Sequence, residues 1–118
     1  MERDLMERLF NFAVHVIKFL REIPSNQENR VIRYQLTKSA TSSGANYEES
    51  QAGSSKADFI FKVEICLKEM RESNYWLRII KATHLASEIP SAELEFLVNE
   101  SEELKKILAS IVKKSKAQ

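Results

Sequence analysis

Apolar and polar positions alternate at helical spacing through the middle of the chain, in two stretches of different character. The first spans 35–50, and its inward positions are mostly small or polar: Leu36, Ser39, Ala40, Ser43, Asn46, Tyr47 and Ser50. The second spans 59–80 and has a mostly apolar heptad seam: Phe59, Val63, Cys66, Met70, Ser73, Leu77 and Ile80. A close-packing face followed by a bulky face is typical of an antiparallel helical bundle.

The first part of the chain carries an apolar stripe that is too wide for one neighbouring helix. One line contains Leu5, Leu9, Phe12, Val16, Phe19 and Ile23, and the adjacent line contains Met6, Phe10, Ala13, Ile17 and Leu20. Such a stripe needs either two neighbours inside the molecule or one neighbour and another subunit. His15 falls on the opposite, polar face, so we expect it to be solvated rather than to bind a metal.

Capping signals predict where the helices begin. Ser25 followed by Glu28 predicts a capping box at the start of the second helix, and Ser55 followed by Asp58 predicts another at the start of the third. Together with the apolar periodicity, these signals predict helices over about 2–23, 28–50, 55–83 and 91–114. The expected fold is all-α: an antiparallel up-down four-helix bundle that forms a single domain over residues 1–118.

Gly44 lies inside the second predicted helix, where glycine costs about 1 kcal/mol relative to alanine. We therefore expect another element to pack closely against this position. The serines of the same helix, Ser39, Ser43 and Ser50, are expected to bond to the carbonyls four residues earlier, so that their partial burial needs no dedicated partners.

The middle third of the chain also has the residue order and spacing of a known bacterial family. The residues that carry this likeness include Ser39, Ser42, Gly44, Asn46, Glu49, Lys56, Asp58, Phe59, Glu69, Glu72 and Trp76. On these residues the chain resembles the four-helix-bundle proteins of the 23S rRNA intervening-sequence family, and it is similar to the accessory protein of diversity-generating retroelements. The resemblance implies a homopentameric ring. Ser43 departs from the pattern, because relatives tend to carry an aliphatic residue there.

Length, charge and apolar runs predict a small soluble domain rather than a strongly basic, secreted or membrane-spanning protein. A chain of 118 residues suffices for one domain with its own core, and a net charge of +1 leaves no domain-scale basic field. No apolar run approaches the roughly 18 residues of a membrane span, and the start of the chain lacks a secretory pattern, so we expect a soluble cytoplasmic protein. Cys66 falls on the apolar seam and is predicted to be a small buried hydrophobe rather than a nucleophile.

Three acids, Glu49, Glu69 and Glu72, could meet where the second and third helices pack, and facing carboxylates of this kind occur in di-iron proteins. A ferritin-like metal site also needs Glu-x-x-His on two helices, a pattern that neither histidine completes. We therefore expect no metal and no other cofactor, and expect the acids to fix helix register by accepting hydrogen bonds. The predicted donors are Asn46, Ser39 and Lys62.

Catalytic patterns are absent from the sequence. Neither histidine belongs to a recognisable motif with a serine or cysteine, and two glycines are too few for a phosphate-binding loop. We do not expect an enzyme.

One strip is a candidate contact for nucleic acid. Arg30, Tyr34 and Lys38 follow one another at steps of four, with Arg33 beside them. Such a strip can contact phosphate and stack on an unpaired base. The alternative is an ordinary solvated face, which the near-neutral charge favours for a single copy, although an oligomer would multiply the strip.

The leading hypothesis is therefore a non-enzymatic helical-bundle protein that self-associates, as a homopentameric ring, and serves as a protein-interaction scaffold. The alternative is an RNA-binding module or a reverse-transcriptase accessory, with nucleic acid or a nucleic-acid-processing enzyme as its partner.

Overall fold

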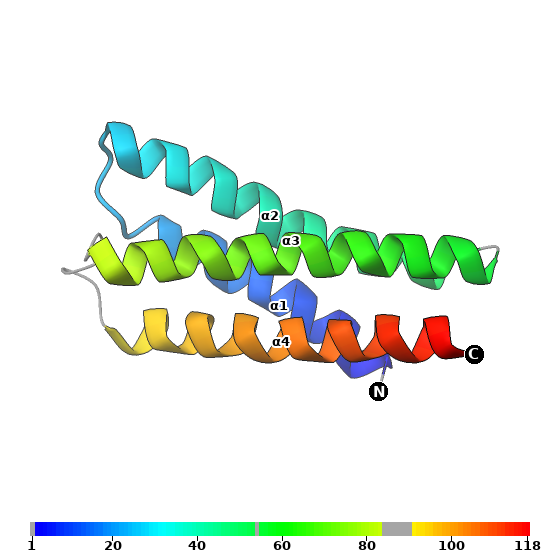
Figure 1. Cartoon of the computed structure of the whole chain (residues 1–118). Helices are drawn as coiled ribbons and strands as arrows, with labels where there is room; N and C mark the ends of the chain where they lie inside the picture. Colours follow the sequence, from blue (N-terminus) through cyan, green and yellow to red (C-terminus); the bar gives the residue numbers. More distant parts are fainter. Residues whose placement is uncertain (1, 54, 84–90) are drawn as a thin grey trace.

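The computed structural model describes residues 2–53, 55–83 and 91–118, and this part of the chain forms a helical bundle. Four helices follow one another in it: α1 (Glu2–Leu20), α2 (Gln27–Gln51), α3 (Lys56–Thr83) and α4 (Ser91–Ala117). They run alternately up and down along one axis, and the described ranges contain no strand (Figure 1). The predicted all-α, up-down four-helix bundle is confirmed.

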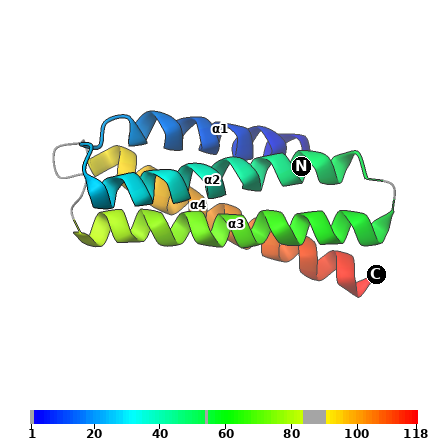
Figure 2. The same cartoon turned by 90° about the horizontal axis from the view of Figure 1, so that it is seen from above.

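The helices do not pack equally on one another. α3 is flanked by α2 and α4, while α1 packs on α2 and more sparsely on α4. The bundle measures 47 × 22 × 20 Å, and Figure 2 shows the carboxyl end of α4 diverging from the amino end of α1. The bundle is therefore tight around α3 and open between α1 and α4.

The core is built from the predicted apolar lines. The first line of α1 is buried along its whole length, as is the α3 seam from Val63 to Ile80. α4 contributes the buried residues Leu94, Leu97, Ser101, Leu104 and Leu108. None of the described helices has the length and apolar character needed to cross a membrane.

α1 ends at Leu20, earlier than the predicted end at residue 23. Beyond Arg21 the backbone bonds to the carbonyl three residues earlier instead of four. The amide of Ile23, for example, donates to the carbonyl of Leu20 at 3.2 Å. Arg33 of α2 donates to the carbonyl oxygens of Leu20, at 2.7 Å, and Ile23, at 2.9 Å. The last carbonyls of a helix need such external donors. Apolar periodicity missed this end because Ile23 is still buried.

The cap at the start of α2 differs from the prediction by one residue. The N-cap is Asn26, whose Oδ1 accepts a hydrogen bond from the Asn29 amide at 2.9 Å. The predicted capping box at Ser25 was therefore wrong. Asparagine and serine cap helices about equally well, so residue preference does not distinguish Ser25 from Asn26. At the start of α3 the predicted cap is confirmed, because Ser55 Oγ accepts from the Asp58 amide at 3.1 Å.

Candidate functional site

The small polar face of α2 packs against α3 through buried hydroxyl groups. The Oγ atoms of Ser39 and Ser73 lie 2.7 Å apart, and Ser43 Oγ donates to the Cys66 carbonyl at 2.8 Å. Ser39 and Ser50 also donate to carbonyls three residues earlier. The prediction of bonds to carbonyls four residues earlier, without dedicated partners, was therefore wrong. The two helices approach so closely that partners across the interface lie within reach.

Ser43 replaces an aliphatic residue of the expected pattern without leaving a polar group unpaired. Its side chain is fully buried, and its hydroxyl oxygen also lies 3.2 Å from the Cys66 sulfur. Burial raises the pKa of the Cys66 thiol to about 11, while the hydrogen bond with Ser43 opposes this shift. The thiol is therefore protonated at neutral pH, as expected of a structural cysteine.

A second buried polar group joins α3 to α4. Asn74 Nδ2 donates to Ser101 Oγ at 2.9 Å, and Arg78 Nε donates to Asn74 Oδ1 at 2.9 Å. Ser101 in turn donates to the Val98 carbonyl at 2.9 Å. Satisfied buried networks of this kind specify the register of neighbouring helices. No local pattern in the sequence predicts the bond between Asn74 and Ser101, because these two residues lie on different helices.

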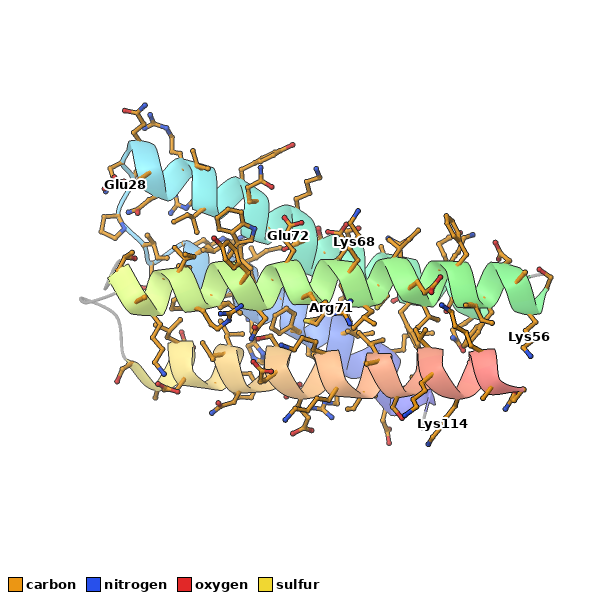
Figure 3. All side chains as sticks on the ribbon, in the orientation of Figure 1. Glu28, Lys56, Lys68, Arg71, Glu72 and Lys114 are labelled. Carbon is orange, nitrogen blue, oxygen red and sulfur yellow. The ribbon has the colours of Figure 1, made fainter. Side chains whose placement is uncertain are left out.

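Glu49 and Glu72, two of the three acids considered for the contact between α2 and α3, have different partners. Glu49 pairs with Lys62 across the two helices, at 3.7 Å, and Glu72 accepts a hydrogen bond from Trp76 Nε1 at 3.2 Å. Figure 3 shows Glu72 and Lys68 on the side of α3 that faces α2. Among the predicted donors, Lys62 contacts Glu49 as expected. For Ser39 and Asn46 the prediction was wrong.

Asn46 is occupied within its own helix. Its Nδ2 donates to the carbonyl of Ser42 at 2.9 Å and to the hydroxyl of the same residue at 3.1 Å. In the described ranges, no group of three or more His, Cys, Asp or Glu side chains could hold a metal ion. His15 is exposed and its ring meets the edge of Phe96, with centroids 5.5 Å apart, while His84 lies outside the described residues.

Three further residues of the family motif, Lys56, Asp58 and Phe59, lie in the first turn of α3. Phe59 is half-buried against the core, and Lys56 lies at the exposed start of α3. Asp58 lies 3.7 Å from Lys62. The contacts of Phe59 with the core and of Asp58 with Lys62 are structural, because they hold the first turns of α3 in place.

Gly44 lies where α1 approaches α2, as the sequence predicted. A Cβ atom at this position would lie 3.5 Å from the Leu9 backbone, which is ordinary van der Waals contact. The approach is therefore close, but it leaves room for a methyl group.

Beside Gly44, a shallow groove runs between α1 and α2. It has a volume of about 330 Å³ and is lined by Leu9, Phe10, Ala13, Val14, Ile17, Thr41, Gly44, Ala45 and Glu48. Phe10 is 60% exposed, whereas Met6, Ala13 and Ile17 are half-buried. The second apolar line of α1 is therefore only partly covered by the described part of the chain. We call this surface the α1–α2 groove.

The predicted basic and aromatic strip lies on the outer surface of α2. Arg30 and Lys38 are exposed, and Tyr34 between them is 65% exposed. Together with Arg33 and Thr37 they line a shallow depression of about 450 Å³. Arg33 differs from the other three because its guanidinium group is bonded to the carbonyls at the end of α1. The strip therefore consists of three exposed side chains and one, Arg33, that caps the end of α1.

Arg8 is an important residue that no pattern in the sequence singles out. Its guanidinium Nη2 lies 2.8 Å from Glu100 Oε1 and 2.8 Å from Glu103 Oε1, and its Nε donates to Glu100 Oε2 at 3.1 Å. These bonds raise the pKa of Arg8 further above its ordinary value. They link α1 to α4 where the two helices are otherwise loosely packed. A spacing of more than ninety residues in the sequence leaves no local signal for such a pair.

Comparison with known proteins finds relatives of this chain in one family. Residues 1–110 match the family described as "23S rRNA-intervening sequence protein". A solved structure of a Bacteroides thetaiotaomicron protein of unknown function from the S23 ribosomal protein family is 34% identical. It superposes with a TM-score of 0.81, over 95% of this chain and 97% of that one. Comparison with curated proteins gives no match.

Proposed function

The chain belongs to the 23S rRNA-intervening sequence protein family, and on this premise we propose that it is a non-enzymatic scaffold that self-associates through the α1–α2 groove. The observation that carries the proposal is the partly uncovered second apolar line of α1. Phe10 exposes 60% of its surface beside a floor of small residues, Ala13, Gly44 and Ala45. Apolar surface of this kind is stabilised when a partner covers it.

A second copy of the chain is the partner that fits this groove best. Large apolar side chains are also exposed on α3 and α4, namely Phe61, Tyr75 and Phe96, at 59%, 48% and 48%. One copy therefore carries both an apolar groove and apolar knobs on other faces. When two different surfaces of successive copies meet, the assembly closes into a ring if the rotation allows. The family resemblance implies a ring of five.

Analytical ultracentrifugation of the full chain tests this proposal. We expect the wild-type protein to sediment as a discrete oligomer, most simply a pentamer, at micromolar concentration. Phe10→Glu should shift it to the monomer, because a carboxylate in the interface loses its hydration without a partner. Asn11→Glu is the matched control, since it adds the same charge at the next exposed position of α1.

Three results of this experiment would count against the proposal. A wild-type monomer at all concentrations would exclude self-association. A Phe10→Glu variant that keeps the wild-type mass would place the interface elsewhere. A discrete oligomer of another size would contradict the ring of five while retaining the groove. Far-UV circular dichroism of both variants should match the wild type.

We propose RNA binding by the α2 strip as the second candidate function. The observation that supports it is the exposed ring of Tyr34 between the exposed cations Arg30 and Lys38. A ring in this position can stack on an unpaired base while the cations neutralise phosphates. In an oligomer several strips would act together, so affinity would rise by avidity and fall steeply with salt.

Fluorescence anisotropy with single-stranded and duplex RNA at two salt concentrations tests this second candidate. Replacing Arg30 and Lys38 with glutamine should reduce the salt slope by about one for each phosphate that the variant no longer neutralises. Tyr34→Ala should weaken binding of single strands more than of duplexes. Absence of binding at low salt would exclude the RNA hypothesis and leave the scaffold proposal unaffected.

A further inference from the structure

A larger cavity lies on the opposite side of α1, between α1 and α4. It has a volume of about 520 Å³ and includes Arg8, whose ion pairs with Glu100 and Glu103 hold the two helices together. Figure 2 shows that the end of α4 then diverges from the start of α1. Its volume is within the range of about 300–1,000 Å³ typical of small-molecule sites. The scaffold proposal does not use this cavity.

The walls of the cavity are apolar, and its rim on α4 is cationic. The apolar lining consists of Leu5, Tyr47, Ile107 and Ile111. On α4 the polar lining residues Lys106, Ser110 and Lys114 follow at steps of four, so the helix rise separates the two lysines by about 12 Å, with a hydroxyl between them. The lining contains one acid, Asp4.

The two lysines of the rim are available to a ligand. No ion pair joins Lys106 or Lys114 to an acid in the described part of the chain, whereas Arg8 is held by two glutamates. Figure 3 shows Lys114 on the side of α4 away from α3. Lys106 interacts with Glu102 only through its charge, without a direct ion pair. An anion bound at this rim would therefore gain two cations without breaking a direct ion pair of the described residues.

We propose that this cavity binds a single-chain anionic amphiphile: a carboxylate with an unbranched apolar tail, of the size of a medium-chain fatty acid. The carboxylate would lie between Lys106 and Lys114, where it can accept a hydrogen bond from the Ser110 hydroxyl. The tail would lie along Ile107 and Ile111, covering apolar surface that is otherwise in contact with water.

Other classes of small molecule match the lining less well. A nucleotide needs an exposed ring for stacking, and the aromatic residue of this lining, Tyr47, is only 1% exposed. It also needs a phosphate cradle of free backbone amides, whereas the lining residues 106–114 lie inside a helix whose amides are already bonded. A sugar would leave most of its hydroxyls against apolar walls.

Decanoate binding to the full chain tests the proposal, measured by displacement of a fluorescent fatty-acid analogue. We expect saturable binding of decanoate and weaker binding of decanol, which lacks the charge. Replacing Lys106 and Lys114 with glutamine should weaken decanoate binding about five- to tenfold, as expected for two partly exposed charge contacts. The matched control replaces Lys68 and Lys113, two exposed lysines outside the lining, with glutamine and should bind like the wild type.

Several outcomes would overturn the proposal. These are no displacement by decanoate, equal binding of decanol, or equal losses in the two lysine pairs. If loss of Lys106 and Lys114 changes the sedimenting mass but not decanoate binding, the cavity is a contact between copies and the proposal is wrong. Phe10→Glu should bind decanoate like the wild type, so failure of the scaffold proposal leaves this test intact.

Discussion

At the scale of single residues, the stability of this bundle depends on a few fully buried side chains. Met70 is fully buried on the α3 seam, and Cys66 and Ser43 share a layer in which a hydroxyl meets a thiol. Such positions respond sharply to charge because the interior offers no water to solvate it. A charge at Met70 or at Cys66 should therefore lower the stability of the fold.

Met70 is the seam position where the effect of a new charge is measured most directly. Met70→Asp places an unpaired carboxylate in the core and should destabilise the fold by several kcal/mol, roughly 3–5, measured by thermal or urea denaturation. Lys68→Asp is the matched control on the same helix, because Lys68 is exposed. Equal losses in the two variants would mean that the core lies elsewhere.

Cys66 should make the stability of the protein depend on pH in the alkaline range. The thiol pKa is about 11 in the folded protein, against an ordinary value of 9.0. Between these values the unfolded chain loses the thiol proton while the folded chain keeps it, so the free energy of unfolding should fall as pH rises through this window. The loss should be at most about 2–3 kcal/mol.

Urea denaturation of the wild type and Cys66→Ala across this pH range isolates the effect from other titrating groups. The stability advantage of the wild type over the variant should shrink from about pH 9 to pH 11. A constant difference between the two proteins would show that ionisation of this thiol does not contribute.

At the scale of helices, α1 and α2 meet at two sites of different kinds. One is a set of hydrogen bonds that caps the end of α1, and the other is a position where a small residue lets the two backbones lie close. Arg33 supplies donors to the end of α1, whereas Gly44 only allows α1 to lie close. Substitution should therefore lower the stability of the protein at Arg33, and leave it unchanged or raise it at Gly44.

Arg33→Gln should destabilise the protein by about 1–3 kcal/mol, because buried carbonyls at the end of α1 lose charge-assisted hydrogen bonds. Arg30→Gln, three residues earlier on the exposed face, is the matched control and should change stability by less than about 0.5 kcal/mol. Hydrogen exchange should show faster opening of the last turn of α1 in Arg33→Gln alone. Similar exchange in both variants would contradict the capping role.

Gly44→Ala should leave the monomer intact or stabilise it by up to about 1 kcal/mol, because alanine favours the helix and the new methyl group meets only ordinary contacts. Denaturation of the Phe10→Glu variant, which we expect to be monomeric, with and without Gly44→Ala measures this. A loss of stability would show that the approach of α1 is tighter than the 3.5 Å contacts indicate.

At the scale of the whole molecule, the bundle is elongated, with two open surfaces on opposite sides of α1. The radius of gyration of the Cα atoms is 14.8 Å, against about 13.5 Å expected for a compact chain of this length. One open surface is the α1–α2 groove, and the other is the cavity between α1 and α4 beyond Arg8.

Small-angle scattering should distinguish the two surfaces. Phe10→Glu should give a radius of gyration near that of the single bundle, whereas the wild type should give a clearly larger value if copies assemble through the groove. Adding decanoate should leave both values nearly unchanged, because the proposed ligand binds within one chain. A wild-type value equal to that of the single bundle would contradict assembly.

Much of the fold was predictable because periodicity reflects burial directly. Apolar lines at steps of three and four lie inward on α1, α3 and α4, and the cap at Ser55 is a local pattern that a local rule can recognise. The basic strip of α2 was likewise visible, since exposed side chains at steps of four share a face.

The sequence by itself determined the number and the inward faces of the helices, because those depend on residues that are neighbours along the chain. Only the tertiary structure decided which polar groups are paired. Arg33 ends α1 from another helix, Ser43 bonds to α3, and Arg8 meets two acids of α4. Such partners lie far apart in sequence, so their meeting depends on how the helices pack, and so do the cavities left where α1 and α4 diverge.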